Sequence, residues 1–454
     1  MKVVKFGGSS LASGEQLQKV YRIVTSDPER KIVVVSAPGK RSSEDIKVTD
    51  LLIECAEKQV SNSDYTEQLN MLLNRYKSIA VELNLPSSVM EEIEAAFLRV
   101  LQSDSSQPKK YLDAVKASGE DNNAKLIAAY FRSMGTKATY VNPKDAGLFV
   151  SDEPGNAQVL PKSYENLYDL RNREGIVIFP GFFGFTEQGE IATFSRSGSD
   201  ITGSILANGI KATIYENFTD VDAVFSVNPN IVKNPKEIKE LTYREMRELS
   251  YAGFSVFHDE ALIPAFRAGI PVNVKNTNNP SAPGTLIVNE RKNINGPVVG
   301  IASDKGFCSI YISKYLMNRE LGFGRKLLQI LEENNVSYEH LPSGIDDITV
   351  ILSEKQMDAQ KEAIIVKRIY DELQADNVEV EHDLSLLMLV GEGMRHNVGT
   401  TAKASQALAD AGVNIEMINQ GSSEVSMMFG IKAIQEDQAV RALYNAFFVG
   451  VATV

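Results

Sequence analysis

The chain opens with a strand that runs into paired glycines. The segment KFGGSS, residues 5–10, follows a buried apolar run and precedes a helical pattern. Paired glycines let backbone N–H groups approach an anion closely, and the N-terminus of the next helix adds positive potential. Lys5 adds a full charge, so Lys5, Gly7, Gly8 and Ser9 predict a phosphate site. The segment matches neither the Walker A nor the GxGxxG pattern, and the alternative is a plain tight turn.

The segment SRSGSDITG, residues 195–203, holds a second polar cluster. Arg196 offers a guanidinium fork that suits a carboxylate. Ser199 and Asp200 stand where a helix should begin, and both residue types also favour the N-cap of any helix. The cluster therefore predicts either a carboxylate site or an ordinary helix cap.

Two acidic segments complete the set of candidates. TDVDAVF, residues 219–225, follows a strand and could hold a nucleotide base or a hydrated Mg²⁺. Its alternative is an acidic turn. SGE, residues 118–120, stands at an expected helix start, where Glu120 could simply complement the helix dipole.

The composition excludes several classes of protein. A length of 454 residues predicts about three domains. A net charge of −12 makes nucleic acid an unexpected partner, because clustered Lys and Arg hold phosphate backbones. No run approaches the ~20 apolar residues of a membrane helix. With two cysteines and four scattered histidines, we expect a cytoplasmic protein without a protein-bound metal.

Residues 1–295 alternate β-branched runs with helical patterns. This alternation predicts a mainly parallel sheet covered on both faces, hence a three-layer α/β domain. The breaker cluster at residues 293–297 marks its end. The predicted strands are 2–6, 31–37, 139–141, 175–179, 212–216 and 271–275, and the predicted helices are 15–24, 49–101 with a break at Pro86, 120–133, 243–252 and 260–268, with another opening at Ser199.

Residues 296–454 contain an internal repeat. Gly322 matches Gly399 and Glu339 matches Glu416, each 77 residues apart and without a gap. Each copy reads as a glycine turn, a helix, a strand with an acidic residue, a polar loop and a strand. The predicted helices are Arg325–Asn334 and Ala402–Ala411. Two α+β units of this kind would pack side by side.

KFGGSS, SGE, RSGSD and TDVD, in this order and near these spacings, resemble an aspartokinase of the amino-acid kinase fold. The resemblance covers essentially the whole chain. The repeat resembles tandem ferredoxin-like ACT domains, above all in GEGM at 391–394 and NIEMI at 414–418. The implied domains are a catalytic domain, 1–295, a first ACT domain at about 300–380 with a contribution from about 435–454, and a second ACT domain at about 385–435.

The resemblance implies ATP with Mg²⁺ and L-aspartate as substrates, and a role for each matching residue. Lys5 would bridge the phosphates among donors from the glycine turn, and Asp200 would organise Lys5. Arg196 would clamp the α-carboxylate of aspartate, and Glu120 would meet its ammonium. The remaining matches are Ser36, Thr49, Phe182 and Ser199 around the aspartate, and Thr219, Asp220 and Phe225 around the nucleotide.

The sequence departs from the family pattern in two segments. Phe225 and the following Asn228-Pro229-Asn230 replace a tyrosine and an Asp-Pro-Arg, and Ser255 replaces a lysine that contacts ATP phosphates. Both changes put polar nucleotide contacts in doubt. They leave room for an amino-acid sensor without catalysis. A second alternative is a related kinase for a different amino acid, against which the pair of ACT domains argues.

The repeat implies feedback control by lysine, threonine or both, in a homodimer or dimer of dimers joined through ACT domains. The product would feed the synthesis of lysine, threonine, methionine and diaminopimelate. The implied effector residues, for which core packing is the alternative, are Met317, Gly322, Phe323, Glu339, Ser343 and Asp346.

Overall fold

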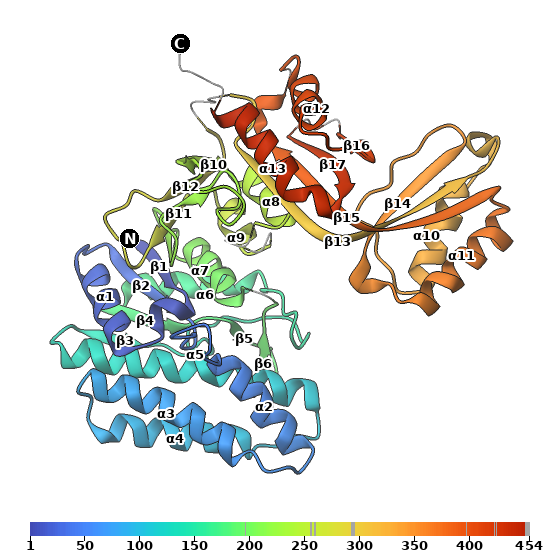
Figure 1. Cartoon of the computed structure of the whole chain (residues 1–454). Helices are drawn as coiled ribbons and strands as arrows, with labels where there is room; N and C mark the ends of the chain where they lie inside the picture. The colour runs from blue at the N-terminus through green and yellow to red at the C-terminus, as the bar shows by residue number, and fades with distance from the viewer. Residues whose placement is uncertain are drawn as a thin grey trace. The chain divides into compact units, whose positions relative to one another are not determined.

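The computed structural model of the 454-residue chain describes residues 1–195, 197–254, 257, 260–291, 296–395, 397–421, 423 and 425–449 (Figure 1). The backbone forms two units. The first holds residues 1–224, 237–247 and 255–292, and the second holds residues 225–236, 248–254 and 293–454. Two short segments that precede the expected boundary therefore group with the C-terminal part. Within the breaker cluster, residues 293–295 lie outside the described residues.

The first unit is built on one mainly parallel sheet, as the sequence predicts. Only its last two strands, β12 and β10, run against the direction of the others. In spatial order the strands are β10 (Glu240–Thr242), β12 (Thr285–Val288), β11 (Val272–Asn276), β7 (Tyr215–Thr219), β1 (Lys2–Phe6), β2 (Arg30–Val35), β4 (Ile176–Pro180) and β3 (Ala138–Tyr140).

Helices cover both faces of this sheet. Alternate residues of β1 and β2, such as Val4, Phe6, Val33 and Val35, join one apolar core with α1 to α5. The opposite faces of β1, β2 and β7 pack on α7. Figure 1 shows α3 and α4 as an outer layer beyond α5. The helices are α1 (Gly14–Thr25), α2 (Val48–Val60), α3 (Thr66–Glu82), α4 (Ser87–Leu101), α5 (Pro108–Ser133), α6 (Lys162–Leu167), α7 (Gly198–Gly209), α8 (Tyr243–Tyr251) and α9 (Ile263–Arg267).

Two small two-stranded sheets, of which the first is antiparallel, complete this part of the chain. They are β5 (Phe183–Phe185) with β6 (Ile191–Thr193), and β8 (Val224–Phe225) with β9 (Glu237–Ile238).

The second unit is built on one antiparallel sheet that two long strands share. β13 and β15 pair along their lengths, and the register shifts between Lys305 and Ser309. The first half of β13 therefore lies in the same half of the sheet as β17, and its second half lies beside β14. In spatial order the strands are β14 (Asp347–Ser353), β13 (Gly300–Ser313), β15 (Asn377–Val390), β17 (Ser426–Lys432) and β16 (Met417–Asn419).

The helices of the second unit follow the predicted repeat. α10 (Phe323–Glu333) and α12 (Thr400–Asp410) have 11 residues each and begin 77 residues apart. Each begins after a glycine in the left-handed region, with φ of +80° at Gly322 and +92° at Gly399. A residue with a side chain is strained in that conformation, so both copies need glycine at this position. The other helices are α11 (Ala359–Leu373) and α13 (Glu436–Tyr444).

The C-terminal helix differs from the sequence-based division. We expected residues from about 435 onward to join the first repeat. Instead α13 shares an apolar core with α12, β17 and the first half of β13, which includes Ile301, Leu387 and Val440. The first repeat has a separate core with α10 and α11. The strand exchange explains the difference, because the second repeat takes its own first strand from residues 300–305.

The expected helix start at residues 118–120 is wrong. α5 begins at Pro108, so Gly119 and Glu120 lie in its middle. A glycine inside a helix costs about 1 kcal/mol relative to alanine, which made a boundary plausible. Here a Cβ on Gly119 would lie 3.1 Å from the Ala37 side chain and 3.0 Å from that of Leu52. The glycine therefore serves close packing of α5 on β2 and α2.

An ion pair links β2 to β7 across β1. The Arg30 guanidinium donates to both carboxylate oxygens of Glu216, at 2.6 and 3.0 Å. The Glu216 side chain is buried, and that of Arg30 is 12% exposed. Removing one partner of a buried pair leaves an uncompensated charge. We therefore predict that Glu216→Gln lowers the free energy of unfolding by about 3–5 kcal/mol, measured by urea unfolding followed by circular dichroism.

The matched control is Glu174→Gln, which breaks the exposed pair with Lys137. Exposed pairs contribute little to stability, so this variant should unfold at the wild-type urea concentration. If both variants unfolded at the same urea concentration, burial would not determine how much the Arg30–Glu216 pair contributes to stability.

Candidate functional site

Four parallel strands of the first unit end side by side. The register aligns Phe6 of β1 with Val35 of β2 and Phe218 of β7, and it aligns Val35 with Pro180 of β4. Ligands of open α/β sheets bind beyond the carboxyl ends of the strands. The sheet thus gathers at one edge the residues that follow these four strands, among them the glycine turn at 7–8.

Lys5 and Asp200 meet at this edge. The Lys5 ammonium lies 2.6 Å from Asp200 Oδ1, and the two residues are only 7% and 8% exposed. Asn217 donates from Nδ2 to the same carboxylate oxygen at 2.6 Å. The Tyr215 hydroxyl donates to the Asp200 carbonyl, and burial raises the pKa of Tyr215 well above its usual value, so it keeps its proton. The Asp200 side chain therefore holds the ammonium of Lys5 in place.

The glycine turn approaches a second glycine closely. A Cβ on Gly39 would lie 2.5 Å from the carbonyl carbon of Gly8, and the Gly39 N–H donates to the Gly8 carbonyl. The Gly7 N–H donates to the backbone carbonyl of Phe218 in β7. That N–H is therefore already engaged, whereas the sequence analysis treated Gly7 as a phosphate donor. A Cβ on Gly7 would lie 3.5 Å from the Lys5 ammonium, so the turn passes close to this charge.

Glu120 points from the middle of α5 toward the end of β2. It is 5% exposed, and Oε2 has no hydrogen-bond partner among the described residues. Burial raises the pKa of its carboxyl to about 8, against the opposite effects of the Ala37 N–H and the Lys116 charge. Next to it, Asn123 donates to the Ser36 carbonyl at 2.6 Å. Thr49 is half-buried as the second residue of α2.

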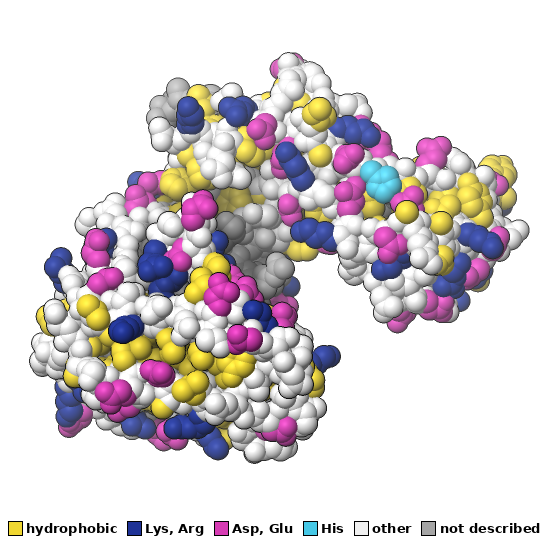
Figure 2. All heavy atoms as spheres, turned by 60° about the horizontal axis from the view of Figure 1, so that its bottom comes forward, with side chains coloured by type: hydrophobic (Ala, Val, Ile, Leu, Met, Phe, Trp, Pro, Cys, Tyr) yellow, Lys and Arg dark blue, Asp and Glu magenta, His cyan; other side chains and the backbone are white. Residues whose placement is uncertain are grey.

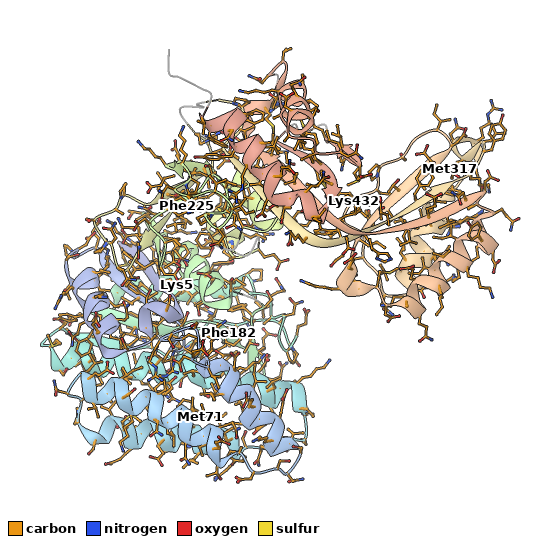
Figure 3. All side chains as sticks on the ribbon, in the orientation of Figure 1. Lys5, Met71, Phe182, Phe225, Met317 and Lys432 are labelled. Carbon is orange, nitrogen blue, oxygen red and sulfur yellow. The ribbon has the colours of Figure 1, made fainter. Side chains whose placement is uncertain are left out.

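Phe182 has a backbone that is unusual for a phenylalanine. Its φ is +80°, and its N–H donates to Thr202 Oγ1 at 2.9 Å. A Cβ on Gly181 would lie 2.5 Å from Ser199 Oγ. The start of α7, the end of β4 and Phe182 therefore pack tightly. Figure 3 shows Lys5 and Phe182 toward the middle of the first unit and Met71 on its outer helices.

The remaining nucleotide and aspartate candidates are less closely grouped. Thr219 ends β7 and bonds to Asp220 at 3.2 Å. Phe225 ends β8 and belongs to the second unit. Ser9 is exposed after β1. Arg196 and Ser255 lie outside the described residues.

The sequence analysis missed an anchor between α5 and the β5–β6 hairpin. Asp113 is 1% exposed and accepts from the backbone N–H groups of Gly155 and Thr193 at 2.8 and 2.7 Å. Lys116 pairs with Asp113 at 2.8 Å, and its ammonium lies 5.7 Å from the centre of the Phe182 ring. The three-residue spacing on one helix was a signal for the ion pair, but the partners from the hairpin were not visible in the sequence.

The effector candidates all lie in the second unit. Met317 and Phe323 are buried in the core of the first repeat. The Glu339 carboxylate accepts the Tyr251 hydroxyl, and Asp346 accepts the Leu316 N–H at 2.8 Å. Ser343 is exposed. Figure 3 shows Met317 in the lobe that contains α10 and β14.

The described residues contain no helix long and apolar enough to cross a membrane. On the face of the molecule in Figure 2, acidic and basic side chains are interspersed.

Both parts of the chain match known protein families. Residues 1–276 match the amino acid kinase family, and residues 387–447 match an ACT domain. Aspartokinase 3 of Bacillus subtilis is 70% identical over 451 residues, which cover 99% of each chain.

Solved structures give the same result. Aspartate kinase of Clostridium acetobutylicum is 38% identical with a TM-score of 0.87, over 98% of this chain and 100% of that one. Aspartokinase III of E. coli, 25% identical, matches in two complexes. The complex with aspartate and ADP has a TM-score of 0.81 over 99% of this chain and 100% of that one. The complex with lysine and aspartate has a TM-score of 0.79 over 99% of both chains.

A parallel sheet with a buried lysine–aspartate pair at its edge, a second unit built from a repeat, and close similarity along nearly the full length lead to one conclusion. The chain belongs to the amino acid kinase family and, within it, to the aspartokinases.

Proposed function

We propose that this protein transfers the γ-phosphoryl group of ATP to the β-carboxylate of L-aspartate, giving 4-phospho-L-aspartate. The observation that carries this proposal is the buried contact between Lys5 and Asp200 at the edge where β1, β2, β4 and β7 end. It fixes a cation at this edge of the sheet, toward which the buried Glu120 points from the middle of α5. MgATP enters as a substrate that carries its own metal ion.

The chemistry requires two anions to meet. The β-carboxylate of aspartate has a pKa of roughly 3.9 and is ionised at neutral pH, so it needs no general base. One of its oxygens bonds to the γ-phosphorus while the bond from that phosphorus to the bridging oxygen breaks, and ADP leaves. At ~4 Å and an effective dielectric constant of ~20, two unit charges repel by about 4 kcal/mol. Lys5 offsets this repulsion, so catalysis consists of positioning and electrostatics.

We place the aspartate pocket at the same edge of the sheet. In this proposal Glu120 receives the α-ammonium, while Ser36, Thr49, Phe182 and Ser199 surround the substrate. Arg196, which the sequence analysis assigns to the α-carboxylate, completes the set. Thr219 and Asp220 border the nucleotide. The support for this arrangement is the convergence of Ser36, Glu120 and Asn123 at the end of β2.

A hydroxamate assay of acyl phosphate formation tests the function directly. The purified chain should form aspartyl hydroxamate from aspartate, MgATP and hydroxylamine. A panel with glutamate and other amino acids in place of aspartate tests the alternative of a different amino-acid kinase. No product with any amino acid would favour the alternative of a sensor without catalysis.

The first prediction of this proposal concerns Lys5. Lys5→Met removes the charge that offsets the repulsion, so kcat in the hydroxamate assay should fall at least ~10²–10³-fold. Near-wild-type turnover would contradict the assignment.

The control for Lys5→Met addresses folding. The single variant leaves Asp200 buried without its cation, which destabilises a protein. The double variant Lys5→Met with Asp200→Asn removes both charges and keeps the contact with Asn217 available. It should recover most of the lost free energy of unfolding and remain inactive.

The second prediction uses the pKa of Glu120. Because burial raises it from 4.5 to about 8, the free carboxyl is mostly protonated at neutral pH. Binding the ammonium of aspartate favours the ionised form. We predict that kcat/KM for aspartate rises with pH up to about 8 and then levels, and that Glu120→Gln lowers it and removes this rise.

The same shift has a consequence for stability. Between pH 4.5 and about 8 the unfolded chain has lost the proton of Glu120 and the folded chain has kept it. Glu120 therefore lowers the free energy of unfolding as pH rises through this window. Glu120→Gln should weaken that fall, and an unchanged pH dependence of stability in this variant would contradict the shifted pKa.

We infer further that lysine, threonine or both inhibit the enzyme through the second unit. The supporting observations are the paired helix starts at Gly322 and Gly399 and the exposed or half-buried polar residues Glu339, Ser343 and Asp346. Pairing of these units between chains, in a homodimer or dimer of dimers, is part of the same proposal. Light scattering of the purified protein tests the assembly.

The third prediction separates the two repeats. If Glu339 holds the ammonium of an effector, Glu339→Gln should raise the half-inhibitory concentration of lysine or threonine about 10-fold. The matched control is Glu416→Gln, its counterpart in the second repeat. Coinciding inhibition curves for Glu339→Gln and wild type would place the effector elsewhere.

A further inference from the structure

Of the buried side-chain oxygen atoms on α5 that lack a hydrogen-bond donor among the described residues, two lie on the same face of the helix. They are Glu120 Oε2 and Asn123 Oδ1. Glu120 is 5% exposed and Asn123 is fully buried. Leaving a buried acceptor unpaired costs free energy, about 1–3 kcal/mol and more for a charged group. Two such atoms near one site therefore indicate a ligand that donates hydrogen bonds.

Both side chains are directed at the end of β2. Asn123 Nδ2 donates to the Ser36 carbonyl at 2.6 Å, and this bond fixes which end of the amide is the oxygen. The Ala37 N–H lies close enough to the Glu120 carboxyl to lower its pKa. Residues three apart on a helix are neighbours on one face. The unpaired oxygens of Glu120 and Asn123 therefore belong to the same small region beside residues 36 and 37.

The chemistry of the two unpaired oxygens indicates which group of the ligand donates hydrogen bonds to them. An ammonium group has three N–H donors and no acceptor. A carboxylate and an amide oxygen side by side offer it two hydrogen bonds and one opposite charge. Lys116, one turn before Glu120, is already paired with Asp113 and with Thr193 Oγ1. The ligand must then bring its own cation.

We propose that Asn123 is a further aspartate-binding residue, whose Oδ1 accepts a hydrogen bond from the α-ammonium that Glu120 also binds. This inference rests on the proposed function, since it identifies the ligand as the amino acid substrate. It gives the amide two roles. Nδ2 holds the Ser36 carbonyl, and Oδ1 selects a substrate that carries an ammonium.

Three variants test the inference in the hydroxamate assay. Asn123→Ala removes the acceptor, so kcat/KM for aspartate should fall about 10- to 100-fold, the effect of one hydrogen bond to a charged group. The KM for ATP should stay within about twofold, because the proposal assigns the nucleotide to Thr219 and Asp220 and not to this residue.

Asn123→Asp separates the two roles of the amide. In its protonated form an aspartic acid donates to the Ser36 carbonyl through its O–H and keeps the other oxygen as an acceptor. This variant should retain kcat/KM for aspartate to within about threefold. It can be read by itself if Asn123→Ala does not fold.

Asn122→Ala is the matched control. Asn122 is also a buried asparagine with unpaired atoms, but it lies about 200° around the helix from Glu120 at 100° per residue. The kcat/KM of the Asn122→Ala variant for aspartate should stay within about twofold of the wild-type value.

The inference fails if Asn123→Ala keeps wild-type kcat/KM, or if Asn123→Asp loses more than tenfold. A wild-type protein that forms no aspartyl hydroxamate would instead refute the proposed function, so the two failures are distinct.

Discussion

The site depends on a buried cation, the ammonium of Lys5, that is held in place by a carboxylate and can still contact an anionic substrate. Lys5 is held at 2.6 Å from Asp200, and Asn217 shares that carboxylate oxygen. A buried pair of this kind contributes little net stability, because desolvation of two ions offsets their attraction. Its value is positional. The ammonium is fixed at the end of β1, beside the glycine turn.

The remaining geometry follows from the sheet and from α5. Parallel register brings the residues after β1, β2, β4 and β7 to one edge. Gly119 lets α5 approach β2 so closely that Glu120 and Asn123 reach the backbone at 36–37. Asp113 and Lys116 tie the same helix to the β5–β6 hairpin and to the ring of Phe182. A single helix thus orients both the acidic and the aromatic part of the proposed aspartate pocket.

The sequence predicted the strands and helices that local pattern determines, including β1, α1, β4 and both helices of the repeat. Prediction from the sequence failed where tertiary packing overrides the local preference for a helix, strand or turn. Gly119 looked like a helix boundary because the contact with Ala37 that favours it is more than 80 residues away. The C-terminal helix was assigned to the wrong repeat, since strand exchange leaves no local trace. Lys5 and Glu120 were identifiable, whereas Asn217, Thr202 and Asn123 became visible only through their partners.

The most direct measurement is a crystal structure with L-aspartate and a non-hydrolysable ATP analogue bound together. The account predicts that Lys5 Nζ contacts the terminal phosphate of the analogue, with the β-carboxylate of aspartate facing that phosphate from the side of Glu120. A structure in which the ammonium of Lys5 contacts Asp200 alone, and the terminal phosphate lies out of its reach, would contradict the account.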